Sequence, residues 1–175
     1  LSELEILSIK SFQKVGHKFI LYTYEKVKGI PTGTIVKDAN KIMKKKDLFQ
    51  FKESFLPFSD LFRYKMLYEK GGYWVDLDMI ALKPLKFREP FIFSSERTIQ
   101  KGPYRNREKE EIENIGILKA PKKSPFYKEL FEACMEETKK EVKENIQFMR
   151  TMRIILEKYG YEKYVKPAKI DRKST

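Results

Sequence analysis

The most constraining part of this sequence is residues 59–85, which read SDLFRYKMLYEKGGYWVDLDMIALKPL. Residues 59–70 have the composition and spacing of a helix that Ser59 or Asp60 caps, and the double glycine at 71 and 72 predicts its end. Residues 73–77 then form a short apolar strand, which glycine lets begin close to the helix end. A helix and a strand joined this tightly favour a fold in which helices cover a sheet.

The rest of the chain repeats this alternation of helices and strands. Ser2 and Glu5 have the spacing of a capping box, which predicts a helix over residues 1–15. Further helices are predicted at 38–45, 125–142 and 147–159, strands at 18–24, 35–36, 80–82, 91–95 and 115–119, and a charged surface loop at 97–113. We therefore expect one α/β domain over residues 1–175, with a mixed, mainly parallel sheet flanked by helices.

The aspartates are concentrated at one point of the chain. The sequence has 6 Asp against 19 Glu, and Asp60, Asp76 and Asp78 are three of the six. Residues two apart in a strand point to the same side, so Asp76 and Asp78 are predicted to present two carboxylates together at a strand end. Such carboxylates repel each other unless a cation such as Mn²⁺ or Mg²⁺ joins them, and these ions also bind diphosphate oxygens. A solvated turn or a helix cap is the plainer interpretation of Asp-x-Asp taken alone.

Arg63 lies three residues after Asp60, so the two side chains share a helix face. A guanidinium there would supply a second positive centre or hold a substrate group through two hydrogen bonds.

The net charge of +12 points first to an anionic partner. The basic residues are 29 Lys and 8 Arg, however, and proteins that read nucleic acid depend on Arg. We therefore expect no nucleic-acid partner. One His and one Cys exclude a cysteine-rich or histidine-rich metal site. No apolar run reaches the length of a membrane span, and no N-x-S/T sequon occurs, which favours a cytoplasmic protein and leaves peripheral membrane contact open.

The string in residues 59–85 resembles the donor-binding core of the DXD-containing sugar transferases with a GT-A (Rossmann-like) fold. Within that family, it is most similar to the group of the initiating mannosyltransferases of yeast, the α1,4-galactosyltransferases and the clostridial glucosylating toxins. Their pattern, SD-x-x-RY-x-x-LY-x-x-GG-x-Y-x-D-x-D, departs here only at Trp74, where tyrosine is usual. The flanks LSELEILSIKSFQKVGHKFILYTY and ENIGILKAPKKSPFYKEL resemble other segments of the same family.

The resemblance implies a nucleotide-diphosphate sugar as donor, with a UDP-sugar favoured over a GDP-sugar, and Mn²⁺ or Mg²⁺ as cofactor. Asp78 would be the direct metal ligand, and Asp76 would contact the ribose and the metal. Trp74 would pack against the nucleotide.

On the sugar side, the resemblance implies that Asp60 and Arg63 hold the hydroxyls of the transferred sugar, and that Asn114 lies near its anomeric carbon. Transfer to a glycan or other hydroxyl acceptor would retain the anomeric configuration. Family members carry a strand before the first helix and a further metal-ligating segment after the last, and we expect this chain to lack both.

Three other interpretations stay open from the residues. A nucleotidyltransferase also uses Asp-x-Asp, although it needs a third carboxylate. A transferase fold without catalysis would keep a binding site only. A nucleic-acid-binding module would explain the charge but not the aspartates. A dehalogenase-type phosphatase is disfavoured, because it needs a further acidic pair downstream and Asp171 is the only aspartate after Asp78.

Overall fold

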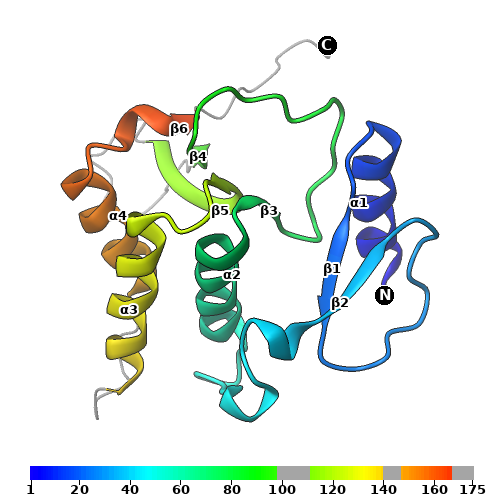
Figure 1. Cartoon of the computed structure of the whole chain (residues 1–175), viewed down its shortest axis with the longest axis horizontal. Coiled ribbons are helices and arrows are strands. Elements are labelled where there is room, and N and C mark those ends of the chain that lie inside the picture. The colour runs from blue at the N-terminus through cyan, green and yellow to red at the C-terminus, as the bar shows by residue number, and fades with distance from the viewer. Residues whose placement is uncertain (98–110, 140–146, 167–175) are drawn as a thin grey trace.

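The computed structural model describes residues 1–97, 111–139 and 147–166, and it is an α/β protein with sheets flanked by helices (Figure 1). The predicted fold class is thereby confirmed. The elements are α1 (Glu3–Lys14), β1 (Ile20–Thr23), β2 (Ile35–Asp38), α2 (Leu56–Lys70), β3 (Gly72–Val75), β4 (Ile92–Arg97), β5 (Glu111–Ala120), α3 (Pro125–Lys139), α4 (Phe148–Lys158) and β6 (Val165–Lys166). In the described residues, short 3₁₀ turns also lie at Ala39–Lys41, Lys45–Asp47 and Glu162–Tyr164.

The strands form two sheets. β1 and β2 pair in parallel, and the larger sheet has the order β3-β5-β4-β6. In the larger sheet β5 is antiparallel to both β3 and β4, and only β4 and β6 are parallel. The prediction of a mixed sheet is right, but the larger sheet is mainly antiparallel. Parallel neighbours need a crossover, usually a helix, and no helix separates β3 from β4 or appears in the described residues between β4 and β5.

Several predicted boundaries differ from the structure. The capping box of α1 is present, with Ser2 accepting from the Glu5 amide and the Glu5 side chain accepting from the Ser2 amide. Asp38 caps only a short 3₁₀ turn, not a helix. α2 begins at Leu56, so the prediction that Ser59 or Asp60 caps it is wrong. A proline in the first turn of α2 is compatible with this earlier start. The backbone N–H that proline lacks would have no partner within the helix at that position.

The predicted strand at 80–82 is also absent. The chain from Asp76 to the start of β4 instead runs toward α1 and returns (Figure 1). Two hydrogen bonds anchor it, from the Ala81 amide to Ser11 Oγ at 2.9 Å and from the Leu85 amide to His17 Nε2 at 2.8 Å. These two amides are therefore satisfied by side chains of the first part of the chain rather than by a neighbouring strand.

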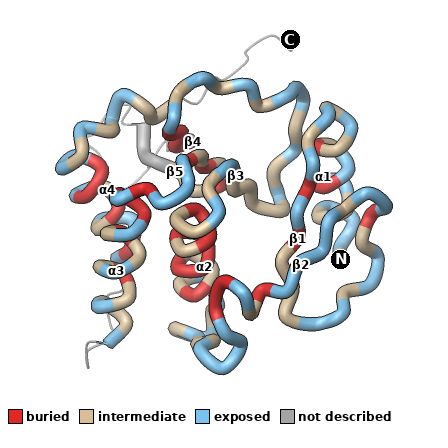
Figure 2. The backbone as a smooth tube through the Cα atoms, in the orientation of Figure 1, coloured by how far each residue is buried: buried red, intermediate tan, exposed pale blue. Residues whose placement is uncertain are grey.

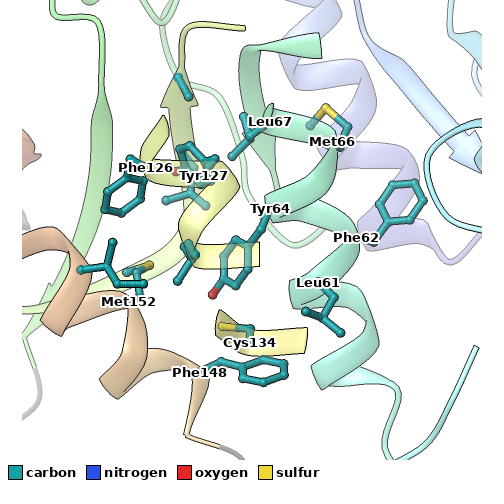
Figure 3. Packing of buried hydrophobic residues seen from close by; sticks show 14 of the residues in the cluster. Leu61, Phe62, Tyr64, Met66, Leu67, Phe126, Tyr127, Cys134, Phe148 and Met152 are labelled. Atoms are coloured by element: carbon teal, nitrogen blue, oxygen red, sulfur yellow. The ribbon is translucent and has the colours of Figure 1, made fainter. Parts of the chain in front are cut away.

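The main core lies between α2, α3, α4 and the larger sheet. Figure 2 shows buried residues along the facing sides of α2 and α3, and Figure 3 shows Tyr64, Tyr127, Cys134, Phe148 and Met152 packed together there. α2 and α3 are direct neighbours, as are α3 and α4. This packing stabilises α2 on its apolar side and leaves its other side available for the polar residues of the candidate site.

A smaller cluster joins α1 to the segment after β3. Ile9, Phe12 and Phe19 are buried there, and Val75 and Met79 pack against them. The end of β3 is thus supported on both sides. Within the described ranges, no helix is long and apolar enough to cross a membrane.

Candidate functional site

Arg63 is the centre of the candidate site. Its side chain is only 4% exposed and extends from α2 toward the end of β3. Nη2 lies 3.1 Å from Asp76 Oδ1 and 3.6 Å from Asp60 Oδ1, while Nη1 donates to the carbonyl of Ile115 at 2.9 Å. The guanidinium carbon also stands 5.1 Å from the ring centroid of Trp74. A buried cation is thereby balanced by two carboxylates, one carbonyl and one aromatic face.

The double glycine brings α2 and β3 into this arrangement. Gly71 has φ +67°, which favours glycine, and it ends α2 with its amide bonded to the carbonyl of Leu67. β3 begins at the next residue, so Asp76 returns to the level of Arg63 on the helix. The pairing of Asp60 with Arg63 on one helix face, predicted from their spacing, is confirmed by their ion pair.

Trp74 also binds the carboxylate of Asp76. Its Nε1 donates to Asp76 Oδ1 at 2.6 Å, so this one oxygen accepts from Trp74 and faces Arg63. The ring also packs against Phe62, with centroids 6.3 Å apart. Trp74 therefore orients Asp76 within the protein, a contact that the sequence pattern did not predict.

The Asp-x-Asp segment is a turn rather than a strand end. β3 stops at Val75, and the Met79 amide donates to the Asp76 carbonyl at 3.2 Å. The prediction that Asp76 and Asp78 lie on one strand is wrong, because the chain turns between them. Asp76 is half-buried and Asp78 is exposed. Their charges still interact, since Asp78 contributes to raising the pKa of Asp76.

Asn114 reaches the site through an irregularity in β5. Pairing of β4 with β5 shifts register between Phe93, which faces Leu118, and Ser94, which faces Asn114. The carbonyl of Ile115 lies in the extra stretch of β5 and accepts from Arg63. The structure thus places Asn114 one residue from a group that binds the central guanidinium.

Gly116 belongs to the same extra stretch of β5. Its carbonyl accepts from the Asp76 amide at 2.8 Å, and its amide donates to Asn114 Oδ1 at 2.6 Å. Ile115 and Gly116 were not among the predicted site residues. The signal for them was a glycine inside an apolar strand, which is typical of a bulge or of a close approach by another segment.

Burial raises the pKa of both acidic groups that face Arg63. For Asp60 the pKa rises from an ordinary 3.8 to about 6, because burial outweighs the lowering effect of Arg63 and the charge of Asp76 adds to the rise. For Asp76 burial again raises the pKa most, while Arg63 and the hydrogen bond from Trp74 oppose it. The carboxyl of Asp60 is therefore poised to gain or lose a proton near neutral pH.

The residues fit a divalent ion only as part of a shared site. Among the residues that the structure describes, no three His, Cys, Asp or Glu side chains gather as a metal cluster. The Asp-x-Asp turn offers two carboxylates, Asp76 and Asp78, and one oxygen of Asp76 already faces Arg63. Mg²⁺ and similar ions often bind one or two carboxylates and take their other ligands from substrate phosphates and water, which this arrangement allows.

Comparison with known proteins agrees with this geometry. The family model described as "Glycosyltransferase sugar-binding region containing DXD motif" matches residues 10–101, more than half of the chain. The match includes Asp60, Arg63, Trp74, Asp76 and Asp78 and ends before Asn114. No individual curated protein matches the chain. Because this match covers more than half of the residues, the chain belongs to the family of glycosyltransferase sugar-binding regions containing a DXD motif.

Proposed function

We propose that this chain transfers a sugar from a nucleotide-diphosphate sugar to a hydroxyl acceptor, with Mn²⁺ or Mg²⁺ as cofactor and with retention at the anomeric carbon. The observation that carries this proposal is the cluster of Asp60, Arg63 and Asp76 beside the exposed carboxylate of Asp78. It combines a buried cation, an oriented carboxylate and an open one at the end of β3, within the family match.

The metal would be held by Asp78 and by Asp76, and it would offset the charge of the leaving diphosphate. Asp76 is oriented for this task by Trp74 Nε1 and by Arg63, so its geometry is set before the donor binds. Asp78 is exposed, so a metal ion held by its carboxylate could also bind a phosphate oxygen of the donor.

Asp60 and Arg63 are proposed to bind hydroxyls of the donor sugar. Asp60 is 16% exposed, so part of its carboxyl remains open while it faces Arg63. Asn114 is proposed to lie near the anomeric carbon, and its Oδ1 is held by the Gly116 amide. A UDP-sugar as donor and a glycan as acceptor complete the proposal. The proposal also includes that this chain is related to the initiating mannosyltransferases, the α1,4-galactosyltransferases and the glucosylating toxins.

Thermal unfolding with nucleotides and metal tests the donor site. UDP or GDP together with Mn²⁺ is expected to raise the melting temperature, and either component alone to raise it less, because a ligand that binds only the folded state stabilises it. Uridine with Mn²⁺ is the matched control, since it lacks the diphosphate. The absence of a shift with every nucleotide diphosphate and metal would contradict the proposal.

Turnover tests the reaction itself. Nucleotide sugars are incubated with Mn²⁺ and the release of nucleoside diphosphate is followed, with and without a glycan acceptor. Binding without release would favour a transferase fold that only binds its ligand. Release of pyrophosphate from a nucleoside triphosphate would favour a nucleotidyltransferase instead.

A further inference from the structure

We propose that Gly116 is a positioning residue, which aligns Asn114 with the Asp-x-Asp turn because it has no side chain. This inference rests on the proposed function, since it assigns a role within the same donor site. Neither the family match, which ends at residue 101, nor the Asp-x-Asp motif includes this residue.

Both backbone groups of Gly116 bind site residues. The amide donates to Asn114 Oδ1 at 2.6 Å, which fixes the rotation of the asparagine side chain. The carbonyl accepts from the Asp76 amide at 2.8 Å, which fixes the first residue of the turn. The peptide groups on either side of the Gly116 Cα thus connect β5 to Asn114 and to the Asp-x-Asp turn.

The space beside Gly116 Cα is filled by side chains of the same site. A Cβ at this position would overlap Met79 Cε and would stand 2.8 Å from Asn114 Oδ1. Met79 follows Asp78 directly and bonds through its amide to the Asp76 carbonyl, so it is part of the turn. Gly116 is not among the glycines with positive φ, and close approach rather than backbone conformation is therefore what requires glycine.

The consequences of adding one methyl group follow from which atoms it meets. The nearest atoms belong to side chains and not to backbone, so Gly116→Ala is expected to fold with the side chains of Met79 and Asn114 displaced. Small displacements of reacting groups can reduce turnover by on the order of 100-fold. The loss is expected mainly in kcat, because Arg63 and its hydrogen bond to Ile115 stay in place to bind the donor.

A double-mutant cycle tests this role. Gly116→Ala, Met79→Ala and the double variant are assayed for kcat and KM with the nucleotide sugar that the wild type uses. Since Met79→Ala removes the overlapping Cε, the double variant is expected to lose less activity than the product of the two single losses. Losses that multiply, or a Gly116→Ala variant with wild-type kcat, would overturn the inference.

Phe148→Leu is the control for lost stability. Phe148 is buried in the main core and belongs to α4, so its truncation lowers the melting temperature at a position outside the site residues named above. It is expected to leave kcat unchanged under conditions where the protein stays folded. If Phe148→Leu reduces kcat as much as Gly116→Ala does at a matched melting temperature, the effect of Gly116 is merely structural.

A readout without any donor separates this inference from the proposed function. Trp74 is the single tryptophan of the chain and bonds to Asp76, so its fluorescence reports on the turn. Gly116→Ala is expected to shift the emission, and adding Met79→Ala to reverse part of that shift. A wild type without turnover would refute the proposed function alone, while unchanged emission in Gly116→Ala would refute the role of Gly116.

Discussion

Arg63 Nη2 lies 3.1 Å from Asp76 Oδ1, and this contact ties the middle of α2 to the residue after β3. Trp74 Nε1 donates to the same oxygen at 2.6 Å. The carboxylate is therefore held from two sides by residues of two different elements. The most conspicuous motif of the sequence, Asp-x-Asp, is oriented by a buried cation that precedes it in the chain.

Replacing Arg63 by alanine is expected to destabilise the protein strongly. It leaves Asp60 and Asp76 without their cation, and breaking a buried pair typically costs about 3–5 kcal/mol. The free energy of unfolding, measured in urea at pH 8, is the readout. Arg63→Lys keeps the charge but not the planar guanidinium, so its free energy of unfolding is expected to lie between those of the wild type and Arg63→Ala. A loss below about 1 kcal/mol, the upper range for exposed pairs, would contradict the buried pairing.

The charge of Asp60 is expected to reduce stability as the pH rises from 3.8 through about 6. Its pKa is raised to about 6 in the folded state, so folding favours the protonated form. The stability contributed by the proton is complete below the ordinary value of 3.8 and is lost as the pH rises through about 6. The rise in the pKa of Asp60 from 3.8 to about 6 corresponds to roughly 2–3 kcal/mol.

Asp60→Asn, which cannot ionise, is therefore expected to be more stable than the wild type at pH 8, with the difference shrinking toward pH 4. Urea unfolding across this range measures it. Asp47→Asn removes the same charge from an exposed position and serves as the control. A stability difference that stays constant with pH would show that Asp60 is not the titrating group.

Asp78→Asn is expected to abolish transfer and leave the fold intact. Asp78 is exposed, and exposed substitutions typically change stability by no more than about 0.5 kcal/mol. Activity should fall by about 100-fold or more, since even the partners of metal ligands typically account for 10–100-fold. Metal-dependent release of nucleoside diphosphate is the measurement, with Asp47→Asn again as the control. Unchanged activity would remove Asp78 from the metal site.

Trp74→Phe is expected to weaken the hold on Asp76 while keeping an aromatic face toward Arg63. The lost hydrogen bond to a charged group should cost on the order of 1–2 kcal/mol. The pKa of Asp76 should rise further, because this hydrogen bond lowers it. Thermal unfolding checks the stability. Tyr73→Phe, next along β3 and on its opposite face, is the control, and an equal loss in that variant would argue against the role of Trp74.

Local features of the sequence predicted much of the fold. The capping box of α1, the stop at Gly71 and the alternation of helices and strands depend on neighbouring residues, and each is present. The pairing of Asp60 with Arg63 is also local, because a spacing of three on a helix fixes the shared face. The predicted start of α2 was wrong, because Asp60 has the residue type of a helix cap but its carboxyl faces Arg63.

Two predicted segments extend beyond the residues that the structure describes. The charged loop predicted at 97–113 falls largely outside the described residues, as does the end of the helix predicted to reach residue 142. The roles of Asn114 near the anomeric carbon and of Trp74 in nucleotide binding stay predictions.

The sequence by itself determined the family, the helix-strand unit and the residue types of the site, because these depend on order and spacing along the chain. Only the tertiary structure decided which groups of other elements meet Arg63. The carbonyl of Ile115 reaches it from β5, through a register shift that no local pattern specifies. Burial then raises the pKa of Asp60 to about 6, a change that depends on how the rest of the chain packs around its carboxyl.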